Sequence, residues 1–363
     1  MKKQINKTVF KKAATTWLIP SLLLTSFVVR AGNINFDFRY ESDSSSYNTA
    51  AKAASASNVS ATNLKMKTGR VDFKGKVNED LSYRLRWRFD KDYGTSSNMT
   101  SNNKTDGFTN HVDYAYLAHK LLPELTMTLG KFGSEIGGFE GNTPASDIYL
   151  QSQVYGKILP SFIYVSGGKL SYNLGQHDMS LLVLNQSETN TTEQSKLTYG
   201  LTYKAQFLEN KEMTLLLSYL NDEKQSLTDD AKKMTGVTSI GIKYEPKPYY
   251  LSIDYLIFEQ KNQTVKDNKD NWNSIVADFG YDFDGIQPKF KYEISQYKAE
   301  TAGVSTTTKY DGVTLGLEYK PIHQENFRYH MMVTQLTTKP AAGDSLFEQH
   351  FIVGTKITAD FLK

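Results

Sequence analysis

From residue 81 to residue 89 the chain alternates strictly between apolar and polar side chains. Leu, Tyr, Leu, Trp and Phe occupy the odd positions, and Ser82, Arg84, Arg86 and Arg88 occupy the even ones. Because a β-strand sends successive side chains to opposite faces, this pattern predicts a strand with one apolar and one basic face. The apolar face could cover the core of a soluble protein. Alternatively, it could face lipid around a barrel whose lumen holds the arginines.

The same alternation recurs along almost the whole chain after residue 31. Clear examples are residues 34–41, 197–207, 251–257 and 327–333. We count about sixteen strands of roughly ten residues, the length that crosses a bilayer at the tilt of a barrel. The composition also favours β-strands. The chain has 23 tyrosines and 19 phenylalanines, which are common in strands, and only 9 prolines.

The connections between these segments alternate between short and long. The predicted short turns are residues 78–80, 121–123, 176–177, 209–211, 246–247, 284–285 and 321–325. The predicted long loops, which are rich in polar residues, are 42–62, 93–109, 133–160, 187–194, 221–235, 259–271, 298–309 and 337–346. Transmembrane barrels have tight turns on the periplasmic side and longer loops outside. The segregation therefore favours an all-β fold, a transmembrane antiparallel up-and-down β-barrel in one domain, over a soluble all-β protein.

The N-terminal segment has the features of a secretory signal peptide. Five lysines up to Lys12 precede an apolar stretch at 13–29, and the small residues Ala31 and Gly32 follow. A single transmembrane anchor is the alternative, but the stretch is short for a span of about 20 residues. We expect residues 1–31 to be cleaved and residues 32–363 to form the barrel. Cleavage removes six Lys/Arg and no acidic residue, which changes the formal net charge from +3 to −3.

The charge balance and the rare residue types argue against several functions. The excess positive charge lies in the signal peptide, so it does not indicate nucleic-acid binding. The chain has no cysteine, which excludes disulfides, cysteine metal sites and a lipoprotein anchor. The six histidines lack zinc-site spacing, and no nucleophile elbow or phosphate-binding loop is present. We therefore expect no cofactor and no catalysis, and a barrel enzyme is the weakest alternative.

The longest connection, residues 133–160, is acidic and rich in glycine. It begins Gly-Ser-Glu-Ile-Gly-Gly-Phe-Glu-Gly-Asn and follows a strand that ends in Gly130-Lys131-Phe132. With the segments 112–117 and 70–77, this arrangement resembles the bacterial outer-membrane porins, and 70–77 is similar to their phosphate-selective O/P branch. The resemblance in architecture covers the whole mature chain. It implies a Gram-negative outer-membrane barrel, usually a homotrimer, whose third loop folds into the lumen and narrows it.

The resemblance also implies a basic wall that faces an acidic loop. The predicted basic wall consists of Arg70, Lys74, Arg84, Arg86, Arg88 and Lys131, and the predicted acidic residues of the loop are Glu135, Glu140 and Asp147. Alternation places Arg39 and Lys76 on the same lumenal face. Carboxylates opposite the wall would offset its repulsion and set a transverse field across the aperture. The alternative is that the arginines only solvate the wall and pair with neighbours such as Asp72 and Asp90.

Together these features predict a porin for passive diffusion of small hydrophilic solutes and ions, with a mild preference for anions. Its expected partners are those solutes, outer-membrane lipid and lipopolysaccharide, and other copies of the chain, without nucleic acid. A structural or adhesive barrel with a closed lumen, acting as a surface receptor, is the alternative from another class. Outer-membrane barrels commonly end in an aromatic residue. Phe361 fits that register, but Leu362 and Lys363 follow it.

Overall fold

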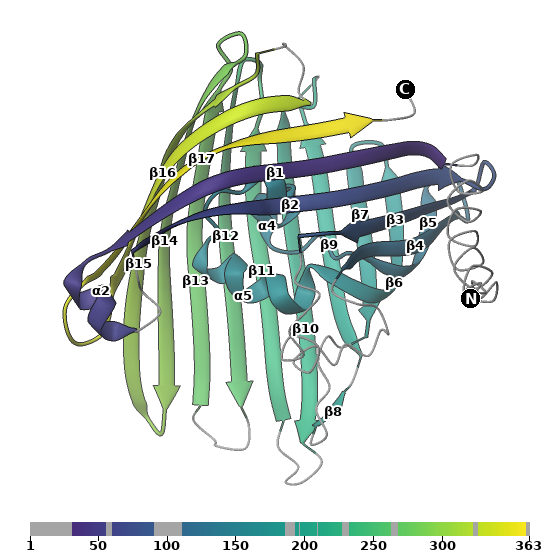
Figure 1. The fold of residues 1–363 in the computed structure, drawn as a ribbon. Coiled ribbons are helices and arrows are strands. Elements are labelled where there is room, and N and C mark those ends of the chain that lie inside the picture. The colour runs from purple at the N-terminus through teal and green to yellow at the C-terminus, as the bar shows by residue number, and fades with distance from the viewer. Residues whose placement is uncertain are drawn as a thin grey trace, which may run out of the picture.

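The chain forms a closed, antiparallel β-barrel (Figure 1). The computed structural model describes residues 31–55, 60–90, 111–185, 193–195, 197–208, 210–226, 232–262, 268–321 and 326–360. The ring is closed by β1 (Ala31–Tyr47), which pairs with both β2 (Ala61–Lys76) and β17 (Leu346–Asp360). The short β8 (Glu193–Ser195) and β9 (Thr198–Phe207) both pair with β10 (Met213–Ser226), so they share one place in the ring. The predicted sixteen-strand barrel is confirmed.

The other strands follow one another around the ring in chain order. They are β3 (Leu81–Arg88), β4 (Val112–Lys120), β5 (Leu125–Gly133), β6 (Tyr164–Leu174), β7 (His177–Leu184), β11 (Lys232–Tyr244), β12 (Tyr249–Asn262), β13 (Asn268–Tyr281), β14 (Ile286–Thr301), β15 (Val304–Tyr319) and β16 (Phe327–Lys339). One helix, α2 (Thr49–Ala54), lies in the first long connection, where the side chain of Asn48 accepts a hydrogen bond from the N–H of Ala51. No helix in the described part of the chain is long and apolar enough to cross a membrane.

The burial pattern is that of a barrel in lipid, with apolar side chains outside and polar ones inside. On β12, Leu251, Ile253 and Tyr255 are 39–48% exposed, whereas the intervening Ser252 and Asp254 are nearly buried. Water would not favour so many exposed large hydrophobic side chains in one band, but a hydrocarbon surrounding does. The ambiguity of the two-faced strands is thereby decided: their apolar faces point outward.

The predicted short turns are confirmed where the structure describes them, while residues 209 and 322–325 lie outside the described residues. The predicted long loops 42–62, 221–235, 259–271 and 337–346 are shorter than expected because strands extend into them, and one predicted long loop is wrong. Residues 298–309 were expected to form a loop, yet β14 continues to Thr301 and β15 starts at Val304. Ala302 and Gly303 have φ angles of 51° and 79°, as in a two-residue hairpin turn. The polar composition of this region reflects strand ends that remain paired beyond the apolar band. The predicted signal peptide, the loop 93–109, most of 187–194 and the C-terminal residues 361–363 lie outside the described residues.

The connection after β5 lies inside the ring of strands. It contains two short helices, α4 (Gly138–Asn142) and α5 (Gln153–Phe162), and a 3-10 turn at Ala145–Asp147. Figure 1 shows α4 and α5 against the lumenal side of the long strands, and they contact β10 to β13. We call residues 134–163 the third loop. Its predicted course into the lumen is confirmed, whereas its helices were not predicted.

Candidate functional site

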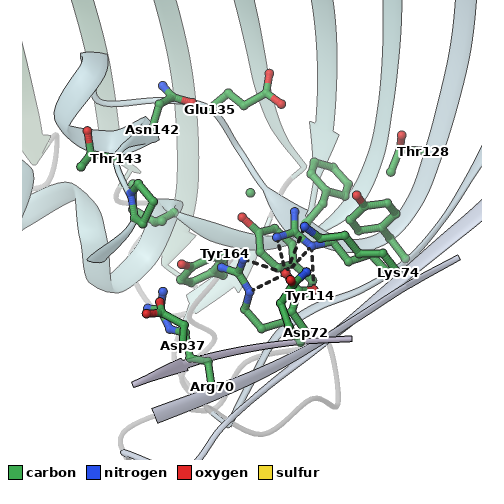
Figure 2. Close-up of a pocket in the computed structure, with 18 of the residues that line it drawn as sticks. Asp37, Arg70, Asp72, Lys74, Tyr114, Thr128, Glu135, Asn142, Thr143 and Tyr164 are labelled. Atoms are coloured by element: carbon green, nitrogen blue, oxygen red, sulfur yellow. Dashed lines mark hydrogen bonds and ion pairs between the residues drawn. The ribbon is translucent and has the colours of Figure 1, made fainter. Parts of the chain in front are cut away.

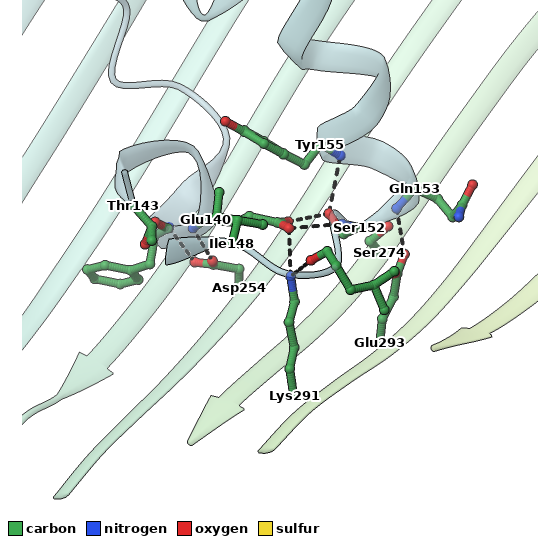
Figure 3. A network of polar contacts seen from close by, with 12 residues as sticks. Glu140, Thr143, Ile148, Ser152, Gln153, Tyr155, Asp254, Ser274, Lys291 and Glu293 are labelled. Atoms are coloured by element: carbon green, nitrogen blue, oxygen red, sulfur yellow. Dashed lines mark hydrogen bonds and ion pairs between the residues drawn. The ribbon is translucent and has the colours of Figure 1, made fainter. Parts of the chain in front are cut away.

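The first half of the third loop is fixed to the lumenal face of β12 and β14. The carboxylate of Asp254 accepts hydrogen bonds from the backbone N–H groups of Phe139 and Glu140, at 2.9 and 3.0 Å. Glu140 in turn accepts from Lys291 Nζ at 2.7 Å and from the N–H and hydroxyl of Ser152 (Figure 3). Because these groups are largely buried, losing one partner would leave a charge or donor unsatisfied at a cost of several kcal/mol.

The second half of the loop is held by cations of β1, β16 and β17. Asp147 pairs with Arg328 and with Lys356, whose Nζ lies 2.7 Å from its Oδ1. Arg39 donates to the backbone oxygen of Ile148 at 2.9 Å and covers the ring of Tyr149 at 4.2 Å. We call Arg39, Asp254, Lys291, Arg328 and Lys356 the docking wall, because each bonds to the loop.

Two loop groups have pKa values that suit this docking. Burial tends to raise the pKa of Asp147, but the charges of Arg328 and Lys356 outweigh it and lower that pKa to about 2. The carboxylate is therefore ionised at neutral pH and attracts both cations. Burial, and next the carboxylate of Glu318, raise the pKa of Tyr149, so that its hydroxyl stays protonated and donates to Glu318 at 2.8 Å.

The opposite side of the lumen remains open. A cavity of about 660 Å³ lies between the loop and the strands β1 to β6 and β17 (Figure 2). Of the predicted basic wall, Arg70, Lys74, Arg84 and Arg86 line it. By contrast, the gap between the loop and β12 to β16 measures only about 50 Å³. The loop thus fills the side of the lumen along β12 to β16 and leaves space along the other strands, including a cavity of about 520 Å³ beside β6 to β11.

A single carboxylate binds most of the basic residues of this cavity. Asp72 accepts from Arg84 at 2.7 and 2.9 Å and from Arg86 at 2.9 Å, and Lys74 lies 3.5 Å away (Figure 2). The two guanidinium groups also cover the ring of Tyr114, at 4.0 and 4.6 Å. These contacts keep the arginine side chains against the wall and fix their positions. Three cations on one carboxylate leave a positive surplus.

Arg70 and Arg88, the remaining arginines of the predicted basic wall, form ion pairs with two other carboxylates. Arg88 bonds to Asp90 at 2.5 Å and lies 3.7 Å from Asp113, whose other oxygen is 3.4 Å from Arg70. Arg70 and Arg88 are also directly opposite each other in the β2–β3 register. The pairing of arginines with Asp72 and Asp90, named as the alternative from the sequence, therefore occurs. Five cations and three carboxylates nevertheless leave the group with a net positive charge.

The predicted acidic residues of the loop do not bond to the predicted basic wall. Glu135 lines the open cavity across from the arginines but pairs with Lys169 of β6 at 2.7 Å. Glu140 and Asp147 point to the docking wall on the far side. The expectation that these carboxylates face one ladder of arginines is thus wrong in its geometry for two of the three. Glu140 and Asp147 attach the loop to the docking wall.

Lys131 differs from the rest of the predicted wall. It follows Gly130, whose φ of 122° and closeness to the Ala115 carbonyl oxygen, 2.3 Å from an added Cβ, leave no room for a side chain. Phe132, which has the same parity along the strand as Thr128, lines the cavity as unbroken alternation predicts, while Lys131 is only 1% exposed and does not line it. Lys76 lies at the periplasmic end of β2 and is exposed.

Sequence reasoning missed most of the docking wall. Asp254 and Lys291 lie 114 and 151 residues from Glu140, and only closure of the ring brings them together. Their polar character at lumenal positions of otherwise ordinary strands was the available signal. Among the described residues no group of three or more His, Asp or Glu side chains is arranged to hold a metal ion.

Comparison with known proteins agrees with this geometry. The sequence profile of the family described as "Putative beta-barrel porin-2, OmpL-like" matches residues 31–361. The chain belongs to this porin family. It is an outer-membrane β-barrel channel of the Gram-negative type. The comparison with curated proteins gave no match.

Solved structures share the fold of this porin at low sequence identity. The anion-selective porin from Comamonas acidovorans has a TM-score of 0.66 at 12% identity, over 90% of this chain and 98% of that one. The outer membrane channel DcaP of Acinetobacter baumannii has a TM-score of 0.66 at 12% identity, over 90% and 96%. OmpT of Vibrio cholerae, in a trimer form, has 0.60 at 14% identity, over 91% and 100%. At these identities the likeness is one of fold.

Proposed function

We propose that this porin passes small hydrophilic solutes and ions by passive diffusion, with a mild preference for anions. The observation that carries the proposal is the asymmetric position of the third loop. It is bonded to the docking wall, and a cavity of about 660 Å³ lies along the basic wall, with a further cavity of about 520 Å³ beside β6 to β11. A solute that crosses the barrel therefore passes close to Arg84 and Arg86.

The charges around the open cavity support the preference for anions. Six cationic side chains but only three carboxylates line it; they are Arg70, Lys74, Arg84, Arg86, Lys169 and Lys356, against Asp37, Asp72 and Glu135. Fixed charge of one sign in a low-dielectric channel raises the local concentration of ions of the opposite sign. The surplus is moderate because Asp72 neutralises part of it, so cations would be disfavoured without being excluded.

Planar-bilayer recording tests the channel itself. The purified, folded barrel should give stable, ohmic conductance steps, as a water-filled passage requires. Silence from a protein that shows the far-UV circular dichroism of a folded barrel would contradict the proposal and favour a closed structural barrel. The same preparation assayed for lipid and peptide hydrolysis should be inactive, which separates the channel from a barrel enzyme.

Reversal potentials in a KCl gradient test the ion preference. Replacing Arg84, Arg86 and Arg88 with Gln should lower the chloride-to-potassium permeability ratio roughly threefold, because the local potential falls. Asp72→Asn should raise the ratio, since it removes the carboxylate that offsets these charges. Lys298→Gln, at an exposed pair with Glu300, is the matched control and should change nothing. Equal ratios in all variants would show that these arginines do not control the passage.

Two further features belong to the proposal. We infer a homotrimer, supported by the trimer form of the similarly folded OmpT of Vibrio cholerae. Mass determination in detergent before and after heating should show three chains, then one. We also infer cleavage of residues 1–31, because the family match begins at residue 31, beside the small residues Ala31 and Gly32. N-terminal sequencing of the membrane-inserted protein should start at Gly32.

A further inference from the structure

The cavity of about 520 Å³ lies between the third loop and the lumenal faces of β6 to β11. It reaches toward the short turns, because Gln206 and Glu245 line it close to the turns that follow β9 and β11. Glu135, Asn142 and Lys169 line both this cavity and the 660 Å³ cavity, so the two adjoin each other at the loop. We call the 520 Å³ cavity the side recess.

Apolar packing closes the side recess toward the long loops. Further along the strands that line the recess, the lumenal side chains of Leu182, Leu220 and Val237 are fully buried. They belong to one hydrophobic cluster with Ile158 of α5. The recess is therefore a blind branch of the lumen. A solute can enter it from the 660 Å³ cavity or from the periplasm, but cannot cross the barrel through it.

The charges of the side recess balance, unlike those of the 660 Å³ cavity. Three cations and three carboxylates line it; they are Lys169, Lys204, Lys243, Glu135, Asp178 and Glu245. Two of the cations form ion pairs within the lining, at 2.7 Å in Lys169–Glu135 and 2.5 Å in Lys243–Glu245. The third, Lys204, is directly opposite Asp178 in the register of β7 and β9. Because each cation has a carboxylate beside it, the recess has little net field to attract an ion of either sign.

Neutral hydrogen-bonding side chains occupy the wall between these charges. Ser171, Ser180 and Thr202 are consecutive neighbours across β6, β7 and β9, and Gln206 is opposite Thr214 across β9 and β10. A hydroxyl group can donate one hydrogen bond and accept two, so the mutual bond of Ser171 and Ser180, at 2.9 Å, leaves acceptor positions on both oxygens. The wall therefore offers hydrogen bonds without offering net charge.

Phe139 and Leu216 give the side recess an apolar side. The ring of Phe139 lies against Gly241 of β11, where an added Cβ would be 2.8 Å from a ring carbon. The backbone N–H of Phe139 donates to Asp254 at 2.9 Å, which keeps the residue in place. The electron-rich face of an aromatic ring attracts C–H groups with a partial positive charge. A molecule that carries both C–H faces and hydroxyl groups matches such a lining.

We propose that the side recess binds uncharged polyhydroxylated solutes of the size of a mono- or disaccharide. Its volume lies within the range of about 300–1,000 Å³ of small-molecule sites, which typically combine apolar groups with a few convergent polar ones. An uncharged solute gains nothing from the surplus positive charge of the 660 Å³ cavity, where it competes with anions. This inference deepens the proposed channel function and rests on it, because the solute reaches the recess through the lumen.

Saturation-transfer NMR tests this binding on the folded barrel in deuterated detergent, with sucrose as the probe. Sucrose protons should receive saturation from the protein, and inorganic phosphate should not displace the sugar. Thr202→Val removes one hydroxyl of the recess and should raise the Kd for sucrose about two- to tenfold, the effect of losing one hydrogen bond. Thr128→Val is the matched control, because Thr128 is a similarly buried lumenal threonine that lines the 660 Å³ cavity and not the recess. Its Kd should equal that of the parent.

A labelled cysteine provides a second variant, because the chain has no cysteine of its own. Gln206→Cys lies in the recess and Ser82→Cys in the 660 Å³ cavity. Reaction with benzyl methanethiosulfonate, verified by mass spectrometry, should abolish saturation transfer to sucrose in Gln206→Cys and preserve it in Ser82→Cys.

Three results would overturn the site in the recess and leave the channel function intact. They are absence of saturation transfer from a folded, conducting parent, an equal rise of Kd in Thr202→Val and Thr128→Val, and transfer that survives labelling of Gln206→Cys. Absence of conductance in the folded parent would instead overturn the channel function, and with it the route by which the solute enters.

Discussion

The two sides of the lumen carry the same kinds of charged residue and use them differently. On the basic wall, Arg84 and Arg86 bond to Asp72, a carboxylate of the wall itself. On the docking wall, Lys291 and Lys356 bond to Glu140 and Asp147, carboxylates of the third loop. Around Asp72, a carboxylate of the wall, the arginines stay beside open space. Lys291 and Lys356 instead hold the loop through its buried carboxylates.

This difference also explains why the passage runs along one side. A loop attached evenly around the ring would close the lumen. Here its helices α4 and α5 contact β10 to β13, and its 3-10 turn contacts β1 and β2. The large cavity lies between the loop and the strands β1 to β6 and β17. Changes on the docking wall should therefore alter the loop's position, and changes on the basic wall should alter ion selectivity.

The largest effect is expected from Asp254→Ala. It removes the acceptor of two buried N–H groups at the start of α4, which costs roughly 2–4 kcal/mol and should release the first half of the loop. Single-channel recording should show noisier current and about a twofold change in mean conductance. Asp311→Ala, at the exposed pair with Lys339, is the control and should conduct as the parent does. Unchanged, quiet current in Asp254→Ala would mean that the docking wall does not hold the loop.

An intermediate effect is expected from acidic pH through Asp147. Its pKa in the folded protein is about 2, below the ordinary value of 3.8, so ionisation of Asp147 stabilises the docked loop at neutral pH. This stabilisation should decrease as the pH falls from about 4 and vanish below about 2. Current noise should rise in that window in the parent protein. In Asp147→Asn the noise should be raised already at neutral pH and lack this acid step; an identical acid step in that variant would assign the titration to another group.

The smallest effect is expected from Glu135→Gln. Glu135 is about half exposed and its pair with Lys169 lies in the open cavity, where such pairs contribute less than about 1 kcal/mol. The thermal unfolding midpoint should stay within the error of measurement. The loss of one negative charge should shift the reversal potential slightly toward chloride. A large loss of stability would mean that this pair, like those of the docking wall, holds the loop.

The alternation of side chains was enough to predict the barrel, its short turns and the lumenal position of the arginines. The hairpin register even made the pairing of Arg86 with Asp72 foreseeable, because these residues are direct neighbours across β2 and β3. The docking wall could not be found in the same way. Which lumenal side chain meets the loop depends on the curvature of a closed ring and on the course of residues 134–163, and neither follows a period of two.

The polar segments show a second limit of pattern reading. Residues 298–301 and 304–309 are strand although they lack an apolar face, because their backbones pair where the strands extend beyond lipid. Apolar and polar residues alternate only where the two faces of a strand lie in different environments. Where both faces contact water, the sequence shows no alternation and the strand cannot be predicted from it.

The central claim, that ions pass along the basic wall and not along the docking wall, is tested most directly by a matched pair of lysine variants. Lys74→Gln removes a half-exposed charge that lines the open cavity, and Lys289→Gln removes one from the small gap beside Glu318. Reversal potentials in a KCl gradient should shift toward potassium in Lys74→Gln and stay at the parent value in Lys289→Gln. A shift that is equal in both variants, or larger in Lys289→Gln, would contradict the claim.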